Sequence, residues 1–139
     1  MSDAKVETIV DGLEPIALLI RADYDAEGLH FFTPNSFSQQ VAYMRHPKDK
    51  VVEPHVHNLV ARQVLYTQEV LLVRRGKVEV NLFSSGREFL TSRILQDGDL
   101  ILLCGGGHSL KMLEETSMIE IKQGPYAGDS DKTRFKVES

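Results

Sequence analysis

Short apolar blocks separated by turn residues are the feature that most constrains how this chain can fold. Nine blocks of strand length occur, at residues 16–20, 29–32, 40–46, 68–73, 77–83, 92–96, 99–103, 108–113 and 117–122. The stretches "RRGK", "SSGRE", "QDGD" and "CGGGH" lie between blocks and supply glycine where the backbone must reverse. No stretch after Asp11 has a capped helical pattern of three turns. The pattern therefore predicts an all-β protein of antiparallel strands, folded as a sandwich or a barrel.

Alternation within the blocks predicts which side chains are buried. Val78, Val80 and Leu82 share one face of a strand, and the residues between them are polar. A chain of 139 residues, 42% of them hydrophobic, can bury a core without disulfides. We expect one domain over residues 1–139, with its core at about 16–123 and an extended polar tail at 124–139 that packs on the barrel or on a partner.

Charge and composition exclude several classes of partner. The formal net charge is −4 and the basic residues are scattered, so no basic surface for nucleic acid is expected. No apolar run approaches the roughly 20 residues that span a bilayer, so no membrane insertion is expected. The start "MSDAKVETIV" has no signal-peptide hydrophobic region, and Cys104 is the only cysteine. These features favour a cytoplasmic protein in a reducing compartment.

The stretch "EPHVHN" places two histidines, His55 and His57, one residue apart. On a strand both side chains point to the same face, where two imidazoles can reach one metal ion. An H-x-H pair of this kind is equally typical of a surface pair with no metal. The pair alone leaves both interpretations open.

Two further stretches favour the metal. Glu69 opens the strand "EVLLVRRG", with six residues between it and Gly76, and "GDLILLCGGGH" runs from Gly98 through an apolar strand to His108. Together with H-x-H, this arrangement resembles the two signature motifs of the cupin superfamily. The resemblance extends roughly from Gln40 to Gln123 and implies a double-stranded β-helix, that is, a jelly-roll barrel. It also implies that the metal ligands are His55, His57, Glu69 and His108.

The chain departs from the cupin motifs at two places. Eleven residues separate His57 from Glu69, more than the usual three or four, so we expect "NLVARQVLYTQ" to form an extended hairpin loop beside the site. Cys104 stands where proline is usual, and the glycine turn before His108 is one residue shorter. Three consecutive glycines can accommodate that shortening. Cys104 is interpreted as a small buried hydrophobic residue in preference to a redox thiol or a metal ligand.

The donor set suits a divalent transition metal. Three imidazoles and one carboxylate are mixed nitrogen and oxygen ligands, which accept Mn, Fe, Co, Ni, Cu or Zn. One or two coordination positions would stay open for a substrate. A structural zinc site of the cysteine-rich type is excluded because no second thiolate exists.

Residues 117–122 admit two interpretations. If Ile119 and Ile121 face the core, Glu120 and Lys122 face solvent, and this interpretation is the favoured one. The alternative comes from a further resemblance of "TQEV", "GGGH" and "IKQGPYAGDSDKTRF" to small bacterial cupins linked to surface-polysaccharide genes. It implies that Lys122 and Tyr126 hold an anionic or sugar-like ligand. Arg62, in the loop after His57, is a third candidate because a guanidinium binds carboxylate or phosphate in a bidentate manner.

These inferences predict a metal-binding cupin that acts on a small polar metabolite. Isomerisation or epimerisation of a sugar derivative is the most economical reaction, with the metal as a Lewis acid and Glu69 as the catalytic base. An Fe- or Cu-dependent dioxygenase and a non-catalytic ligand-binding module are the alternatives, so enzymatic activity itself stays open. A homodimer is expected because edge strands of a small barrel are usually covered.

Overall fold

The computed structural model describes residues 4–137, which contain ten strands and one short 3₁₀ helix, η1 (Gly128–Ser130). These residues form two compact units, which are described separately. Unit 1 contains residues 4–24 and 66–137, and unit 2 contains residues 25–65. Within residues 4–137, no helix is long and apolar enough to cross a lipid bilayer.

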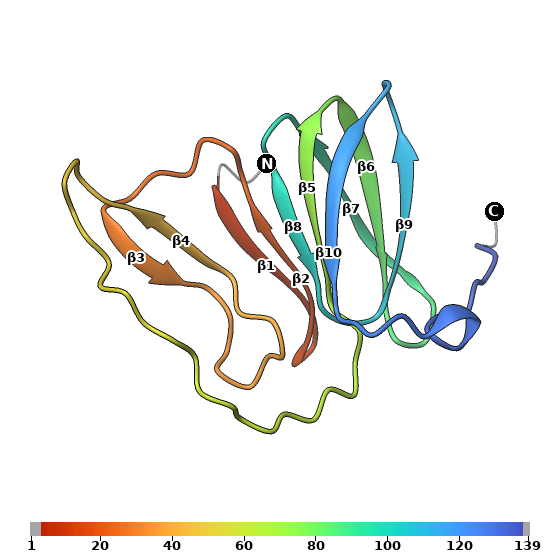
Figure 1. The fold of residues 1–139 in the computed structure, drawn as a ribbon. Coiled ribbons are helices and arrows are strands. Elements are labelled where there is room, and N and C mark those ends of the chain that lie inside the picture. The colour runs from red at the N-terminus through yellow and green to blue at the C-terminus, as the bar shows by residue number, and fades with distance from the viewer. Residues whose placement is uncertain (1–3, 138–139) are drawn as a thin grey trace. The chain divides into compact units, whose positions relative to one another are not determined.

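Unit 1 is built from two antiparallel sheets (Figure 1). The five-stranded sheet has the order β1-β2-β8-β5-β10, and the three-stranded sheet has the order β7-β6-β9. The strands of the larger sheet are β1 (Val6–Asp11), β2 (Glu14–Ile20), β8 (Leu100–Leu103), β5 (Glu69–Arg75) and β10 (Ser117–Lys122). Those of the smaller sheet are β7 (Phe89–Gln96), β6 (Lys77–Phe83) and β9 (Gly107–Met112). The predicted all-β class with antiparallel sheets is confirmed.

One strand, β1, was not predicted. Its register against β2 shifts between Ile9 and Val10, because their partners are Ala17 and Pro15 and Ile16 of β2 is the extra residue. Ile9 is buried in the core while Val10 is exposed, which is the ordinary alternation of neighbouring residues on a strand. Three of the six residues of β1 are polar, namely Glu7, Thr8 and Asp11, so this strand lacks the apolar block by which the others were recognised.

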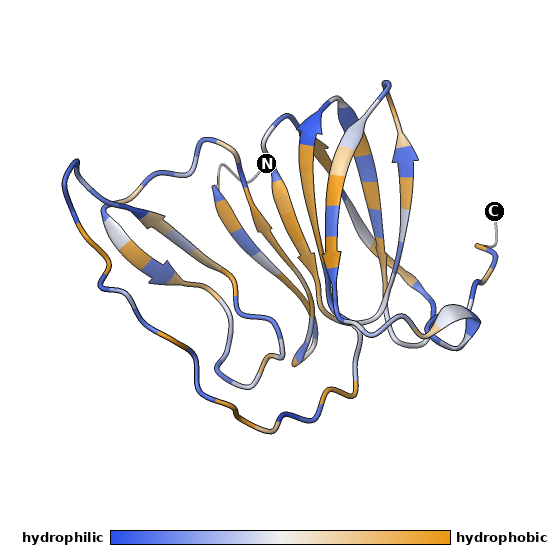
Figure 2. Cartoon of the chain, viewed as in Figure 1, coloured by the Kyte–Doolittle hydropathy of each residue, from blue (hydrophilic) through white to orange (hydrophobic). Residues whose placement is uncertain are grey.

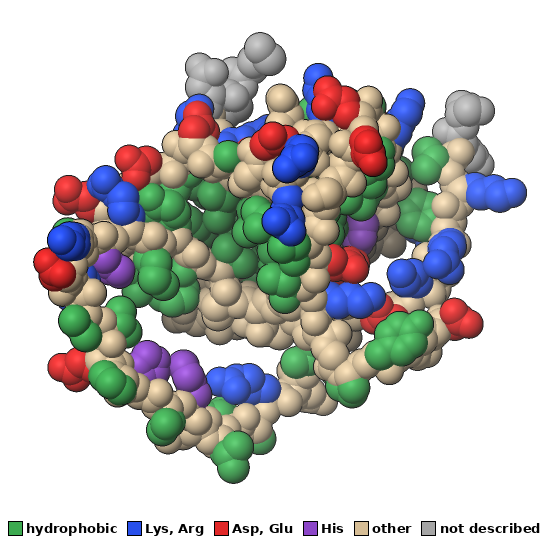
Figure 3. All heavy atoms as spheres, turned by 45° about the horizontal axis from the view of Figure 1, so that its top comes forward, with side chains coloured by type: hydrophobic (Ala, Val, Ile, Leu, Met, Phe, Trp, Pro, Cys, Tyr) green, Lys and Arg blue, Asp and Glu red, His purple; other side chains and the backbone are tan. Residues whose placement is uncertain are grey.

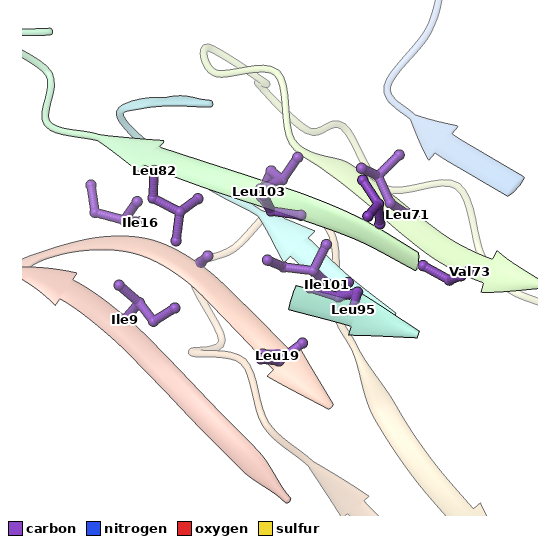
Figure 4. Close-up of a cluster of buried hydrophobic side chains, with 12 residues drawn as sticks. Ile9, Ile16, Leu19, Leu71, Val73, Leu82, Leu95, Ile101 and Leu103 are labelled. Atoms are coloured by element: carbon purple, nitrogen blue, oxygen red, sulfur yellow. The ribbon is translucent and has the colours of Figure 1, made fainter. Parts of the chain in front are cut away.

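The two sheets of unit 1 share one hydrophobic core, drawn in Figure 4. The larger sheet contributes inward-facing residues such as Leu19, Leu71 and Ile101, and the smaller sheet contributes Leu82 and Leu95. The predicted inner face of β6 is confirmed, since Val78, Val80 and Leu82 are all buried. Figure 2 shows β2 and β8 as almost continuously hydrophobic, which is typical of strands covered on both faces.

The described strands do not close into a barrel, because no ladder joins the two sheets. Side chains join them instead at one edge. Arg93 of β7 donates from Nε and Nη2 to the two carboxylate oxygens of Glu7 on β1, at 2.9 and 2.6 Å. This hydrogen bond lowers the pKa of Glu7 from its ordinary value of 4.5. The double-stranded β-helix topology stays a prediction.

Asp99, just before β8, holds together the ends of three strands. Its carboxylate is almost fully buried and accepts hydrogen bonds from the backbone N–H groups of Ala22 and Gln96, each at 2.8 Å. Arg21 Nη1 donates to the same carboxylate at 3.1 Å and to the Ile94 carbonyl at 2.7 Å. The buried charge is therefore paired and fully hydrogen-bonded, which offsets its desolvation.

Unit 2 contains a single hairpin of β3 (Gly28–Phe31) and β4 (Ala42–Arg45), followed by a long segment without strands. One face of the hairpin carries Arg45, which forms ion pairs with Asp25 and Glu27 at 3.2 and 3.9 Å. The other face is apolar. The predicted strand at 40–46 is confirmed in its central residues only.

Replacing Asp99 with alanine should destabilise the fold strongly. The substitution leaves two buried backbone N–H groups and the Arg21 guanidinium without their acceptor, which costs about 2–4 kcal/mol. Urea unfolding followed by circular dichroism measures this loss. Glu88→Ala, at an exposed acidic residue, is the matched control and should change the free energy of unfolding by less than about 0.5 kcal/mol. Equal effects of the two substitutions would contradict the role given to Asp99.

Candidate functional site

Glu69 and His108 meet between the two sheets of unit 1. Glu69 begins β5 and shares the inner face of that strand with Leu71 and Val73, both core residues. His108 lies on β9 opposite Leu82, another core residue. Glu69 Oε1 and His108 Nε2 are 3.4 Å apart, and their side chains are 19% and 33% exposed. The pair therefore lies where the apolar core ends and solvent can enter.

A tight turn delivers His108 to this position. Gly106 has a φ of 58°, and a side chain there would collide with the carbonyl oxygen of Phe83. A side chain on Gly105 would collide with the carbonyl oxygen of Pro15. Only glycine allows this close backbone approach, which explains the consecutive glycines that the sequence places before His108.

The inner face of β10 adds two charged side chains to the pair. Lys122 lies opposite Glu69 and Glu120 lies opposite Leu71, so both belong to the face that lines the interior. Ile119 and Ile121 point the other way and are 42% and 56% exposed. The favoured interpretation of residues 117–122 was therefore wrong: the isoleucines face outward and the charges face the site.

Hydrogen bonds within this group shift the pKa values of both glutamates. A hydrogen bond with His108 is the largest cause that lowers the pKa of Glu69 from 4.5 to about 2. Glu69 also hydrogen-bonds to Glu120, and this contact raises the pKa of Glu120 above its ordinary value. Glu69 is thus the carboxylate that stays ionised, as a metal ligand must.

The C-terminal segment closes one side of the site. Asp131 accepts a hydrogen bond from the Thr67 hydroxyl at 2.6 Å, and its other oxygen lies 3.8 Å from Lys122 Nζ. Further along, the Phe135 ring packs edge-on against Phe83, with ring centroids 5.2 Å apart. The polar tail thus packs on unit 1 and fixes an acidic partner for Lys122.

His55 and His57 lie in unit 2, in a segment with no strand, so their predicted strand placement was wrong. Their rings still lie side by side, with centroids 5.2 Å apart. His55 Nδ1 is 2.8 Å from the Glu53 carbonyl, which can only accept a hydrogen bond. This contact places the proton on Nδ1 and leaves Nε2 of His55 with a free lone pair, the form that binds a metal.

The residues present suit the predicted metal, although the structure brings them together only in pairs. Glu69 lies with His108 in unit 1, and His55 lies with His57 in unit 2. Among residues 4–137, no group of three or more His, Cys, Asp or Glu side chains is arranged to hold a metal. Each pair offers an ionised carboxylate or an imidazole nitrogen, which are ligands of divalent transition metals.

The other candidate residues differ in how well they are placed. Lys122 is 29% exposed and lies in the site, whereas Tyr126 is 88% exposed and Arg62 is exposed in unit 2. Burial raises the pKa of the Cys104 thiol to about 11, so it stays protonated and is a poor ligand or nucleophile. This supports the interpretation of Cys104 as a small hydrophobic residue.

Sequence reasoning did not identify Glu120, Asp131 and Thr67 as members of this group. Glu120 could have been found from the alternation of β10, had its inner face been assigned correctly. Asp131 and Thr67 are 64 residues apart in sequence, and no local pattern signals their contact.

Comparisons with protein-family models, with curated proteins and with solved structures find no match to this chain. What the site can do therefore has to be argued from its own geometry and chemistry.

Replacing His108 with alanine should raise the pKa of Glu69 from about 2 toward its ordinary value of 4.5. The reason is that the hydrogen bond with His108 is the largest cause of the lowered pKa. A carbon-13 NMR titration of labelled glutamate carboxyls measures this pKa. His30→Ala is the control: it removes an imidazole of unit 2, held at 2.6 Å from the Glu27 carbonyl, and should leave the titration of Glu69 unchanged. An unchanged Glu69 pKa in His108→Ala would contradict the interaction.

Proposed function

We propose that this chain is a metal-binding protein of the cupin type, with a jelly-roll fold, that isomerises or epimerises a small anionic sugar derivative. Four inward-facing side chains carry the proposal: Glu69, His108, Glu120 and Lys122, gathered from both sheets at one end of the core. Charged side chains of both signs that gather at the solvent-accessible edge of an apolar core, and that shift one another's pKa values, are typical of a ligand-binding site.

The metal would be held by Glu69 and His108 together with His55 and His57. The 3.4 Å approach of Glu69 to His108 and the free Nε2 of His55 support this ligand set. A bound divalent transition metal supplies Lewis acidity toward a carbonyl or hydroxyl oxygen. Its identity is one of Mn, Fe, Co, Ni, Cu or Zn.

The protein's own side chains would bind the substrate and hold a proton. Lys122 Nζ lies at the inner face beside Glu69, where it can bind a phosphate or carboxylate group of the substrate. The contact between the carboxyls of Glu69 and Glu120 lowers the pKa of Glu69 and raises that of Glu120, so Glu120 is the carboxyl of the pair that takes up a proton more readily. Such a pair can accept a proton from a carbon next to a carbonyl on one oxygen and return it from the other.

Arg62 and Tyr126 remain predicted contacts of the substrate, but they are less well placed for this role than Lys122. Both are exposed, and neither has a place among the inward-facing residues of unit 1. Lys122 is the side chain to which we assign the anionic group.

The purified protein should bind one divalent metal per chain, and each of His55→Ala, His57→Ala, Glu69→Gln and His108→Ala should weaken binding by at least about tenfold. Titration calorimetry with zinc and with manganese, and metal content after dialysis, measure the effect. His46→Ala alters an exposed histidine outside the ligand set and is the control. Wild-type protein without measurable metal affinity would overturn the metal site.

Lys122→Ala should weaken the binding of sugar phosphates about tenfold or more, because it removes a charge-assisted hydrogen bond. Binding is followed by thermal shift across a panel of sugar phosphates and nucleotide sugars, and catalysis by deuterium uptake from solvent into the bound sugar. Lys111→Ala is the control, since Lys111 lies opposite Glu79 on the outer face of β9.

Equal binding by the two lysine variants would contradict the role of Lys122. Binding without deuterium uptake would leave a ligand-binding module in place of an isomerase. Substrate-dependent oxygen consumption with iron or copper would replace the isomerase by a dioxygenase.

A further inference from the structure

Residues 124–137, which we call the C-terminal clasp, lie against unit 1 without joining either sheet. The clasp follows β10, pairs with no strand and contains only the short helix η1. Among residues 4–137, the one backbone–backbone hydrogen bond that involves it is internal, from the Asp131 N–H to the Gly128 carbonyl at 3.2 Å. No ladder of a sheet therefore has to break for the clasp to leave the surface, which places it among the segments that open most easily.

Two groups of side-chain contacts anchor the clasp at the end of unit 1 that holds the candidate site. In the first, the Thr67 hydroxyl donates a hydrogen bond to Asp131 at 2.6 Å. In the second, the Phe135 ring packs edge-on against Phe83, with ring centroids 5.2 Å apart, and the Arg87 guanidinium lies 5.8 Å from the centroid of the Phe135 ring. The clasp is thus held at two points, four residues apart.

The first anchor also supplies a counter-ion to the cation of the site. Asp131 Oδ2 lies 3.8 Å from Lys122 Nζ, and both side chains are partly exposed. This distance is too long for a hydrogen bond, so Asp131 provides charge to Lys122 without satisfying its N–H donors. Glu69 and Glu120, the other acidic residues on this inner face, belong to strands and cannot withdraw. Figure 3 shows acidic, basic and histidine side chains gathered at this part of unit 1.

From this arrangement we propose that the clasp is a gate that an anionic ligand opens by replacing Asp131 on Lys122. The inference rests on the proposed function, in which Lys122 binds the anionic group of the substrate. A phosphate oxygen can approach Nζ to hydrogen-bond distance, whereas Asp131 stays 3.8 Å away while Thr67 holds it. Two anions beside one ammonium repel each other, so a bound ligand weakens the hold of Asp131 and of the clasp.

The gate makes Asp131 a residue that determines specificity. A neutral sugar brings no charge to replace the Asp131 carboxylate and leaves the clasp closed, so the site selects anionic ligands. Only the open fraction of molecules binds, and the apparent affinity for an anion is lowered by that fraction. By linkage, the bound anion raises the open fraction by the same factor. Anion affinity and accessibility of the clasp therefore report one equilibrium.

The affinity for inorganic phosphate, followed by NMR chemical-shift titration of metal-free protein, tests the gate without involving the metal. Asp131→Asn should bind phosphate about fivefold more tightly than wild type, because it removes the competing charge and keeps the shape of the side chain. Phe135→Ala loosens the second anchor and should tighten binding about twofold or more. Asp129→Asn is the matched control: it removes the same charge from an exposed residue of η1 and should leave the affinity unchanged.

Limited trypsin digestion of the wild-type protein tests the opening itself. The bond after Lys132 lies between the two anchors and should be cut at least about threefold faster in saturating phosphate than in sodium chloride of equal ionic strength or in glucose. Mass spectrometry follows the released peptide. Cleavage after Lys50, an exposed residue of unit 2, is the internal control and should not change.

Equal phosphate affinity of Asp131→Asn and wild type, or cleavage after Lys132 that does not depend on phosphate, would overturn the gate. If Lys122→Ala still abolishes phosphate binding in that case, the anion site of the proposed function stands and the gate alone fails. If the double variant Lys122→Ala/Asp131→Asn binds phosphate as tightly as Asp131→Asn, or none of these proteins binds it up to about 50 mM, the assignment of the anionic group to Lys122 fails and the gate fails with it.

Discussion

The register of β10 against β5 determines which charged side chains reach the candidate site. Because Lys122 lies opposite Glu69 and Glu120 lies opposite Leu71, the alternation of the strand turns both charges to the inner face. A slip of one residue would bring Ile119 and Ile121 inward and expel Glu120 and Lys122 from the site. The same alternation on β5 and β9 places core residues and site residues on continuous inner faces. Core packing therefore fixes the position of the charged group.

The sequence allowed much of the fold to be predicted, because nine strands carry clear apolar blocks and the inner face of β6 follows a strict period of two. It failed at β1, because polar residues occupy half of this strand and leave no apolar block to recognise. It also failed on β10, because hydrophobicity was taken to mark the inner face. On this strand the outer face is the more hydrophobic one, and only the pairing with β5 reveals which face is inside.

Part of the candidate site could also be predicted from the sequence. Glu69 and His108 were inferred together from motif spacing, and their side chains do meet at 3.4 Å. Asp131 was not inferred, because its position depends on how the tail docks through Phe135 onto Phe83. The predicted strand at His55 and His57 is absent because residues 51–65 have no neighbouring strand in the described chain to pair with. A pattern of alternation makes a strand only where a partner is within reach.

The segment of residues 51–65 determines how costly the proposed metal site is to assemble. It carries His55 and His57, and it belongs to a unit without a core of its own. Placing two imidazoles around a metal from such a segment costs conformational entropy, which lowers the affinity of the complete site.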